Sequence, residues 1–201
     1  IEVDHIPGVQ RFIGIGQLAP DVLAWLWPQR RLIDDDAVQL AKRAWAAYCA
    51  SSPVKWAELA HGTQPALPFM APALLRQLQE LPGARDGLSL TERLTLGYLA
   101  EAGPKPAGRV FAELMAKREP LPFLGDMMFY ALMRPLIDGA APLLAETEAG
   151  LVLTELGRAV LDGRAYWLEH ASHERWVGGV CLRPGEAHWA LDEDLQPVIR
   201  H

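Results

Sequence analysis

Three histidines near the end of the chain, His170, His173 and His188, are of the residue type that most often binds a metal ion. Glu169 and Glu174 lie beside them in the sequence and offer carboxylates. A zinc site needs ligands held at helical or hairpin spacing, and the first two histidines have that spacing only if one helix covers both. The segment leads into a strand-like stretch instead. We therefore expect exposed histidines in a connecting segment and no bound metal.

The stretch Gly14–Ala19 has the G-x-G-x-x-A spacing of a dinucleotide-binding turn. That turn binds pyrophosphate between the strand and the helix of a βαβ unit, with an acidic residue about 20 residues later. Here Pro20 follows at once and only helices are predicted next, so we expect a chance match and no cofactor. The chain contains no nucleophile elbow, P-loop or His-Glu-x-x-His motif. The sequence names no catalytic residue, and it leaves the question of an enzyme open while favouring a non-catalytic role.

The composition is that of an ordinary globular protein. The chain has 201 residues, 50% of them hydrophobic, and a formal net charge of −6, which is enough for one domain or two small ones. No uninterrupted apolar run reaches the ~20 residues that a membrane-spanning helix needs. Only two cysteines are present, Cys49 and Cys181, so we expect a reducing, cytoplasmic location. Because the sequence begins at Ile1 without a methionine, we interpret it as a fragment of a longer protein.

Residues 1–86 predict an N-terminal helical region with a possible short leading strand over 1–6. Pro20 starts one helix, and Asp34–Asp36 caps a second that runs to about Ala50. Shorter helices follow over about 52–60 and 69–81. In the second helix one apolar face recurs at intervals of three and four and is expected to be buried, namely Val38, Ala41, Trp45 and Tyr48. The tryptophans of this region are expected to be core residues, namely Trp25, Trp27, Trp45 and Trp56.

Residues 87–165 predict a winged helix-turn-helix-like module. Ser89 and Glu92 form a capping box at the start of its first helix. A second helix is predicted over about 107–118, and Asp126 caps a third that Pro135 must bend or limit. Two apolar segments around the polar stretch 146–150 predict a hairpin, and a last helix follows from Thr154 to Gly163.

Residues 166–201 predict a C-terminal β-hairpin packed on the rest, which completes a mainly α fold. The strands are expected at Trp176–Leu182 and Ala187–Leu191, joined by a turn at Arg183–Glu186. Gly178–Gly179 inside the first strand indicates a bulge or a close approach of another backbone segment.

The charges of the winged module argue against DNA as its partner. DNA binding relies on Lys and Arg that neutralise phosphates, and a recognition helix normally carries several. Between Leu88 and Gly163 there are seven Lys or Arg residues against ten Asp or Glu residues. The tip of the wing carries Glu146 and Glu148, and the predicted recognition helix has Arg134 as its single cation. We therefore do not expect nucleic acid to be the partner.

An apolar helix beside an acidic wing is better suited to bind protein. The candidate interaction surface is made of exposed apolar residues and one arginine, namely Met127, Met128, Tyr130, Arg134, Trp176 and Trp189. The function we expect is that of a non-catalytic cytoplasmic interaction or structural module, which binds a protein partner or its own N-terminal domain. The alternatives are a winged-helix nucleic-acid-binding regulator and an enzyme whose site needs a missing N-terminal region.

Eight local patterns also occur in a familiar order, namely Phe12–Pro20, Arg30–Arg31, Ala44–Tyr48, Leu67–Phe69, Gly87–Arg93, Phe123–Asp126, Leu153–Leu161 and Arg175–Val180. With them the chain resembles, over nearly its whole length, the C-terminal part of an uncharacterised bacterial family, domain of unknown function family 1835. The resemblance implies that a further region precedes this one. It implies no activity, because none is assigned to the family. Where the family ends in a Trp-Arg-Trp-Asp-like string, this chain has Trp189–Asp192 with alanine and leucine between.

Overall fold

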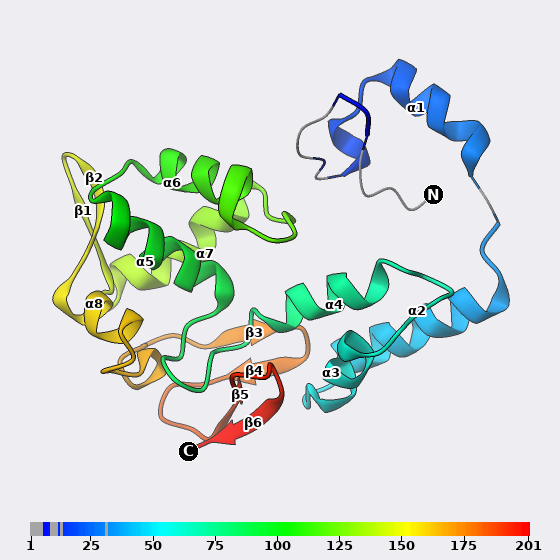
Figure 1. The fold of residues 1–201 in the computed structure, drawn as a ribbon. Coiled ribbons are helices and arrows are strands. Elements are labelled where there is room, and N and C mark those ends of the chain that lie inside the picture. Colours follow the sequence, from blue (N-terminus) through cyan, green and yellow to red (C-terminus); the bar gives the residue numbers. More distant parts are fainter. Residues whose placement is uncertain (1–5, 9–11, 13, 31) are drawn as a thin grey trace.

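The computed structural model describes residues 6–8, 12, 14–30 and 32–201. Within these residues it contains eight α-helices and six short strands, so the fold is mainly α (Figure 1). The strands form three separate antiparallel pairs. The predicted leading strand over 1–6 lies outside the described residues except for Ile6.

The N-terminal helices begin where the sequence predicts. Pro20 is the first residue of α1, and Asp34 Oδ1 accepts a hydrogen bond of 2.8 Å from the Ala37 amide at the start of α2. The first turn of a helix leaves amide donors without a partner. Proline has no amide hydrogen to leave unpaired, and the Asp34 side chain accepts a hydrogen bond from one of these amides. The four helices are α1 (Pro20–Leu26), α2 (Asp35–Tyr48), α3 (Val54–His61) and α4 (Met70–Leu78).

The buried face of α2 is not the predicted one. Val38 is 39% exposed and Trp45 is 68% exposed, whereas the buried residues are Ala37, Leu40, Ala44 and Ala47. The helix carries two apolar faces, and the face made mostly of small alanines is buried where α2 packs on α3, because small side chains let two helices approach closely. The expectation of a tryptophan core is wrong for the same region. Trp56 is fully buried, but Trp25 and Trp27 are, like Trp45, more than half exposed.

The middle segment follows its prediction closely. The capping box is confirmed, since Ser89 Oγ accepts a bond of 3.2 Å from the Glu92 amide and Glu92 Oε2 accepts one of 2.7 Å from the Ser89 amide. The helix expected over 107–118 ends in a π-helical turn. Pro135 does not end the third helix, α7, which continues to Asp138. The helices are α5 (Leu90–Ala102), α6 (Ala107–Glu113) with the π-helical turn Leu114–Arg118, and α7 (Asp126–Asp138).

The predicted hairpin after these helices is confirmed. β1 (Leu144–Thr147) pairs with β2 (Gly150–Leu153), so that Leu144 lies opposite Leu153. Thr154 then caps α8 (Glu155–Leu161), since its Oγ1 accepts a bond of 3.0 Å from the Gly157 amide. Turn residues and cap residues therefore predict most of the local structure of this segment. The predicted cap at Asp126 is wrong, because Gly125 is the N-cap residue of α7 and Asp126 is its first helical residue.

The C-terminal segment forms two hairpins instead of the single predicted one. β3 (Arg175–Val177) pairs with β4 (Val180–Leu182), and β5 (His188–Leu191) pairs with β6 (Pro197–Arg200). The expected pairing across the turn at 183–186 is wrong because the chain already reverses at Gly178–Gly179.

That glycine pair makes a two-residue turn in which Gly178 has a φ of +57°. The Gly179 amide donates a bond of 2.8 Å to the Tyr48 carbonyl, and a β-carbon at Gly179 would overlap the Cys49 carbonyl. The predicted close approach of another backbone segment is therefore confirmed at the end of α2.

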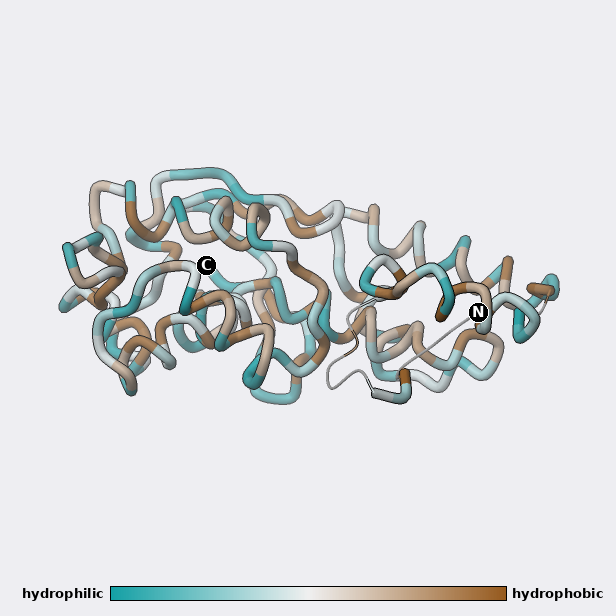
Figure 2. The backbone as a smooth tube through the Cα atoms, turned by 90° about the horizontal axis from the view of Figure 1, so that it is seen from above, coloured by the Kyte–Doolittle hydropathy of each residue, from teal (hydrophilic) through white to brown (hydrophobic). Residues whose placement is uncertain are grey.

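Two hydrophobic cores organise the molecule. The middle core joins α5, α6, α7, the β1–β2 hairpin and α8 with the short segment 166–171. The outer core joins α2, α3 and α4 with β3, β4 and β5. The first and last predicted segments thus share one core although more than 90 residues separate them in sequence. Figure 2 shows that hydrophobic and hydrophilic residues alternate along the helical turns of the chain.

Candidate functional site

The largest group of exposed apolar side chains near the predicted recognition helix lies at the start of α7. Phe129, Met133 and Leu136 are buried in the middle core and fix the orientation of this helix. The 3.6-residue period then turns the intervening residues outward, and Met127 is 80% exposed. We call the exposed residues of this stretch the α7 surface, namely Leu121, Phe123, Met127, Met128 and Tyr130.

Two of these five residues were not predicted from the sequence. Leu121 and Phe123 belong to the segment that leads into α7 and alternate with prolines at 120 and 122. A proline-rich apolar stretch of this kind is compatible with either a buried strand or an exposed loop, so its sequence did not reveal a surface. With Leu121 and Phe123, the exposed apolar stretch begins five residues before the first residue of α7, Asp126.

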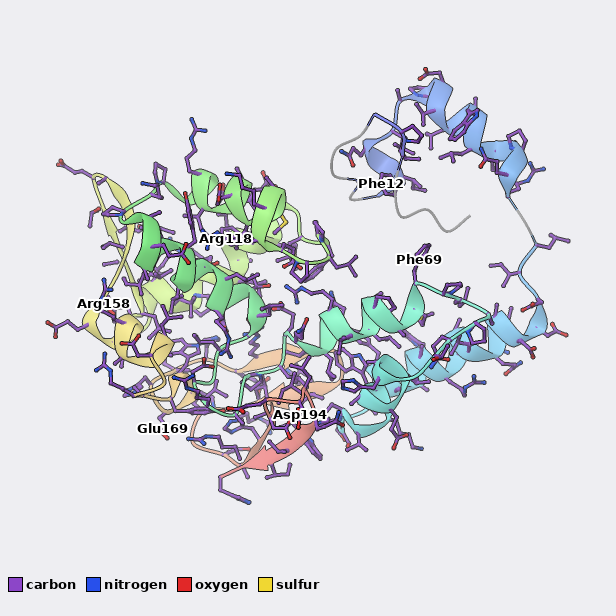
Figure 3. All side chains as sticks on the ribbon, in the orientation of Figure 1. Phe12, Phe69, Arg118, Arg158, Glu169 and Asp194 are labelled. Carbon is purple, nitrogen blue, oxygen red and sulfur yellow. The ribbon has the colours of Figure 1, made fainter. Side chains whose placement is uncertain are left out.

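The cations closest to this helix in sequence are bound to carboxylates. Arg134, the single cation of α7, donates to both oxygens of Asp138 at 2.7 and 2.8 Å and to Glu146 of β1 at 3.3 Å. Arg118, labelled in Figure 3, donates a bond of 2.7 Å to Glu101. A guanidinium that already serves two carboxylates has little positive field left for a phosphate. The pairing therefore opposes the use of α7 as a DNA-reading helix.

The six predicted interaction residues belong to different elements. Met127, Met128, Tyr130 and Arg134 all lie on α7, with the side chains exposed. The two predicted tryptophans lie on strands of the outer core. Trp176 of β3 is exposed, and its Nε1 donates a bond of 2.7 Å to Glu174, whereas Trp189 of β5 is half-buried against the outer core.

A buried ionic network lies where the two cores meet, and sequence reasoning missed it. Arg76 of α4 donates from Nε and Nη2 to the two oxygens of Glu119, at 2.6 and 2.7 Å. Its Nη1 donates to Glu80 at 2.9 Å, and its Nη2 also donates to Thr91 Oγ1 at 2.9 Å. Glu119 directly follows the π-helical turn, and its amide donates to the Leu114 carbonyl at 2.9 Å. The network therefore binds α4 of the outer core to α5 and to the end of α6.

Arg175 extends this network from β3. Its Nη2 lies 3.1 Å from Glu80 Oε2, and its Nη1 lies 3.0 Å from Glu92 Oε1. Glu92 is also the capping-box residue of α5, so one carboxylate serves a helix start and an inter-core ion pair. We call the whole set the junction network, namely Arg76, Glu80, Thr91, Glu92, Glu119 and Arg175.

The charged groups of the junction network are paired with one another, and their remaining oxygens accept hydrogen bonds. Burial lowers the pKa of Arg76, but its bonds to Glu119 and Glu80 outweigh that effect and raise the pKa above its ordinary value. Carboxylate oxygens of the network also accept hydrogen bonds from backbone amides, as Glu119 Oε1 does from the Leu121 amide at 3.0 Å. Paired, buried charges of this kind hold two parts of a protein in one arrangement.

A separate open cavity of about 500 Å³ lies beside the segment that joins α4 to α5. Its apolar lining comes from five leucines, and Arg85 and Arg93 contribute cations. Arg93 is bound to Asp86 at 2.7 Å, and Arg85 donates to the Asp162 carbonyl at 2.7 Å. Burial raises the pKa of the Asp86 carboxyl, which the Leu88 amide and Arg93 oppose. The lining residues include no serine, cysteine or histidine, so this cavity offers no nucleophile–base pair.

The expectation of exposed histidines is wrong, because His188 is buried on β5 and His170 and His173 are half-buried. Both ring nitrogens of His188 are engaged, with Tyr166 Oη at 2.8 Å and with the Glu186 carbonyl at 2.9 Å. His173 lies against the Trp167 ring, and burial lowers its pKa. In the described part of the chain no group of three His, Cys, Asp or Glu side chains is arranged to hold a metal ion. The Gly14–Ala19 stretch forms a short 3-10 turn, Ile15–Gln17, that leads into α1.

Comparisons of the chain with family models, with curated proteins and with solved structures found no match. The resemblance to domain of unknown function family 1835 therefore stays a prediction. Among the described residues, no helix has both the length and the apolar character required to cross a bilayer.

Proposed function

We propose that this chain is a non-catalytic protein-interaction module, in which α5–α8 and the β1–β2 hairpin form a winged-helix-like unit. The order of three helices, a two-stranded hairpin and a trailing helix supports this interpretation. In such a unit α7 takes the place of the recognition helix and β1–β2 takes the place of the wing. We place the module in the cytoplasm as part of the same proposal, because both cysteines are free.

The α7 surface is the observation that carries this proposal. Five large apolar side chains within residues 121–130 are exposed in a unit whose core is otherwise well filled. A contiguous apolar stretch of this kind marks a contact site for another macromolecule more often than a solvated face. Methionines suit such a site because their flexible side chains adapt to different partners.

The charges around this surface define the partner that fits it. Asp126 precedes Met127, and Asp138 and Glu146 already neutralise Arg134, so the rim is acidic. An acidic rim around an apolar centre attracts a protein segment with apolar anchors flanked by Lys or Arg, and it repels a polyanion. The proposed partner is a basic amphipathic segment of another protein.

Affinity capture with the full chain tests this proposal. The doubly substituted Met127→Glu/Met128→Glu chain should lose the proteins that the unsubstituted chain retains, because each glutamate places a charge in the apolar centre. Trp25→Glu, which changes an exposed apolar residue on α1 outside the candidate interaction surface, is the control and should retain them. Equal retention by both variants contradicts the proposal.

Fluorescence anisotropy with random DNA duplex at low salt tests the nucleic-acid alternative. The proposal expects no binding at micromolar concentrations. Micromolar affinity that falls steeply as salt is added would show counterion release and would overturn the proposal in favour of a nucleic-acid-binding module.

A further inference from the structure

The outer side of α2 is a second apolar face that nothing in the described chain covers. Val38, Ala41 and Trp45 are exposed and lie at i, i+3 and i+7, within about 60° of arc on the helix. Ile33, which is also exposed, precedes the first turn. We call these four residues the α2 outer face. On another side of the helix four residues are buried, two of which, Ala44 and Ala47, pack in the outer core, so the helix is apolar on two sides and covered on one.

The tryptophan of this face is held in place. The Trp45 ring stacks on the Tyr48 ring at a centroid distance of 6.0 Å, and Tyr48 in turn meets the buried Trp56 edge-on at 5.0 Å. An exposed indole that rests on a fixed aromatic pair loses little side-chain freedom when a partner covers it. Tryptophans in this situation are frequent anchors of protein interfaces.

One edge of the α2 outer face carries two opposite charges. Asp35 and Lys42 lie about 100–120° around the helix from Ala41, on the edge away from the buried residues. Both are exposed, and neither forms an ion pair with any described residue. They are seven residues apart, with Val38 near their midpoint. The face is therefore apolar at its centre and has an acidic group and a basic group at nearly equal distances on either side.

We propose that the α2 outer face pairs with the same face of a second copy of this chain, in antiparallel orientation about a two-fold axis near Val38. In an antiparallel helix pair the same edges meet, so Lys42 of each copy lies opposite Asp35 of the other. The two Val38 side chains meet at the axis, and Trp45 of each copy covers Ile33 of the other. A parallel pair would instead bring this edge against the opposite edge of the partner, so Lys42 and Asp35 of the two copies would not meet.

This symmetry is the reason to choose a second copy over a different protein. An isologous interface requires a surface complementary to itself, and the sequence around Val38 has that property in both its apolar and its charged residues. A helix of 14 residues is about 21 Å long, so the contact is small and the dimer is weak and concentration-dependent. The face lies on α2, which Figure 1 shows in a different part of the molecule from α7, and it is independent of the α7 surface and of the function proposed for that surface.

Sedimentation equilibrium of the purified full chain tests the dimer. The unsubstituted chain should dimerise at micromolar concentrations, and Trp45→Glu should be monomeric at the same concentrations. Trp25→Glu is the control, because Trp25 is a similarly exposed tryptophan on α1 and should leave the dimer intact. A monomeric unsubstituted chain, or a Trp45→Glu chain that dimerises as before, overturns the proposal.

A charge exchange tests the orientation. Lys42→Glu and Asp35→Lys should each weaken the dimer by about tenfold, because each creates two like-charge contacts, and the doubly exchanged chain should recover most of the affinity. Arg43→Glu is the matched control, since Arg43 lies on the same helix but points away from the face and should change the affinity little. Circular dichroism verifies that every variant is folded. Failure of the double exchange to recover affinity, or an equal effect of Arg43→Glu, excludes the antiparallel pair.

Discussion

Two arginine clusters in this molecule have the same chemistry and opposite surroundings. Arg76 and Arg134 each donate to both oxygens of one carboxylate and to a second carboxylate, at distances of 2.6–3.3 Å. The side chains of Arg76 and Glu119 are 3% and 1% exposed, whereas those of Arg134 and Asp138 are 53% and 54% exposed. Water competes for the second cluster and is excluded from the first. The comparison separates the effect of burial from the effect of pairing.

The two clusters also differ in the parts of the fold that they connect. The junction network connects α4 and β3 of the outer core to α5 and the end of α6, so its charges cannot separate without disturbing the contact between the cores. The Arg134 cluster joins α7 to the neighbouring strand of the same module. We infer that the first cluster fixes the arrangement of the two cores and that the second mainly shapes the charge of a surface.

Arg76→Ala has the largest expected effect. The substitution leaves Glu119 and Glu80 buried without their main cation and also removes the contact of the guanidinium with the Phe123 ring. Loss of one partner of a buried ion pair costs about 3–5 kcal/mol of unfolding free energy. Urea denaturation measures this loss, and Arg134→Ala is the matched control. A loss below about 1 kcal/mol would show that the junction network does not hold the cores together.

Asp86 and Arg93 form an intermediate case, because the carboxylate is 1% exposed and the guanidinium 40% exposed. Burial raises the pKa of Asp86, so the folded chain holds this proton to a higher pH than the unfolded chain does. The contribution of Asp86 to the unfolding free energy therefore falls as the pH rises from about 4, the ordinary carboxyl value, through the raised pKa.

Asp86→Asn tests this linkage. At pH 7 it should lower the unfolding free energy by about 1 kcal/mol, because the cost of burying the charge offsets part of the ion pair. The stability difference between the unsubstituted chain and the variant should shrink as the pH is raised from 4 to 7 in urea titrations. A difference that grows over this range would mean that the pairing with Arg93 outweighs burial.

Local patterns of the sequence predict the starts and turns of the middle module. The capping box at Ser89 and the hairpin around residues 146–150 each depend on a few adjacent residues, and both are present in the structure. Where two local patterns compete, the sequence does not decide. α2 has two apolar faces at helical spacing, and the C-terminal segment has turn residues both at 178–179 and at 183–186. In each case tertiary packing selects one of the two, against α3 for α2 and against the end of α2 for the turn at 178–179.

The junction network shows why a buried site escapes a sequence pattern. On α4 the leucines of one stripe are buried in the outer core, so Arg76 and Glu80, on the opposite side, fit the pattern of a solvated ion pair at i and i+4. Only the packing of a second core on that side buries them. The predicted α7 residues, in contrast, needed no distant partner, because their exposure follows from the burial of Phe129, Met133 and Leu136 on the same helix.

Arg134→Ala has the smallest expected effect. Its bidentate contact with Asp138 has good geometry, yet a solvated ion pair gains little over its separated, hydrated partners, and we expect a change within about 0.5 kcal/mol. The same urea titration at low and high salt measures it, and Glu148→Ala, in the turn between β1 and β2, is a control for the change of surface charge alone. If Arg134→Ala instead approaches the cost of Arg76→Ala, then pairing and not burial governs both clusters. The Arg134 cluster would then hold α7 against the hairpin, and the acidic rim of the α7 surface would be a consequence of that structural role.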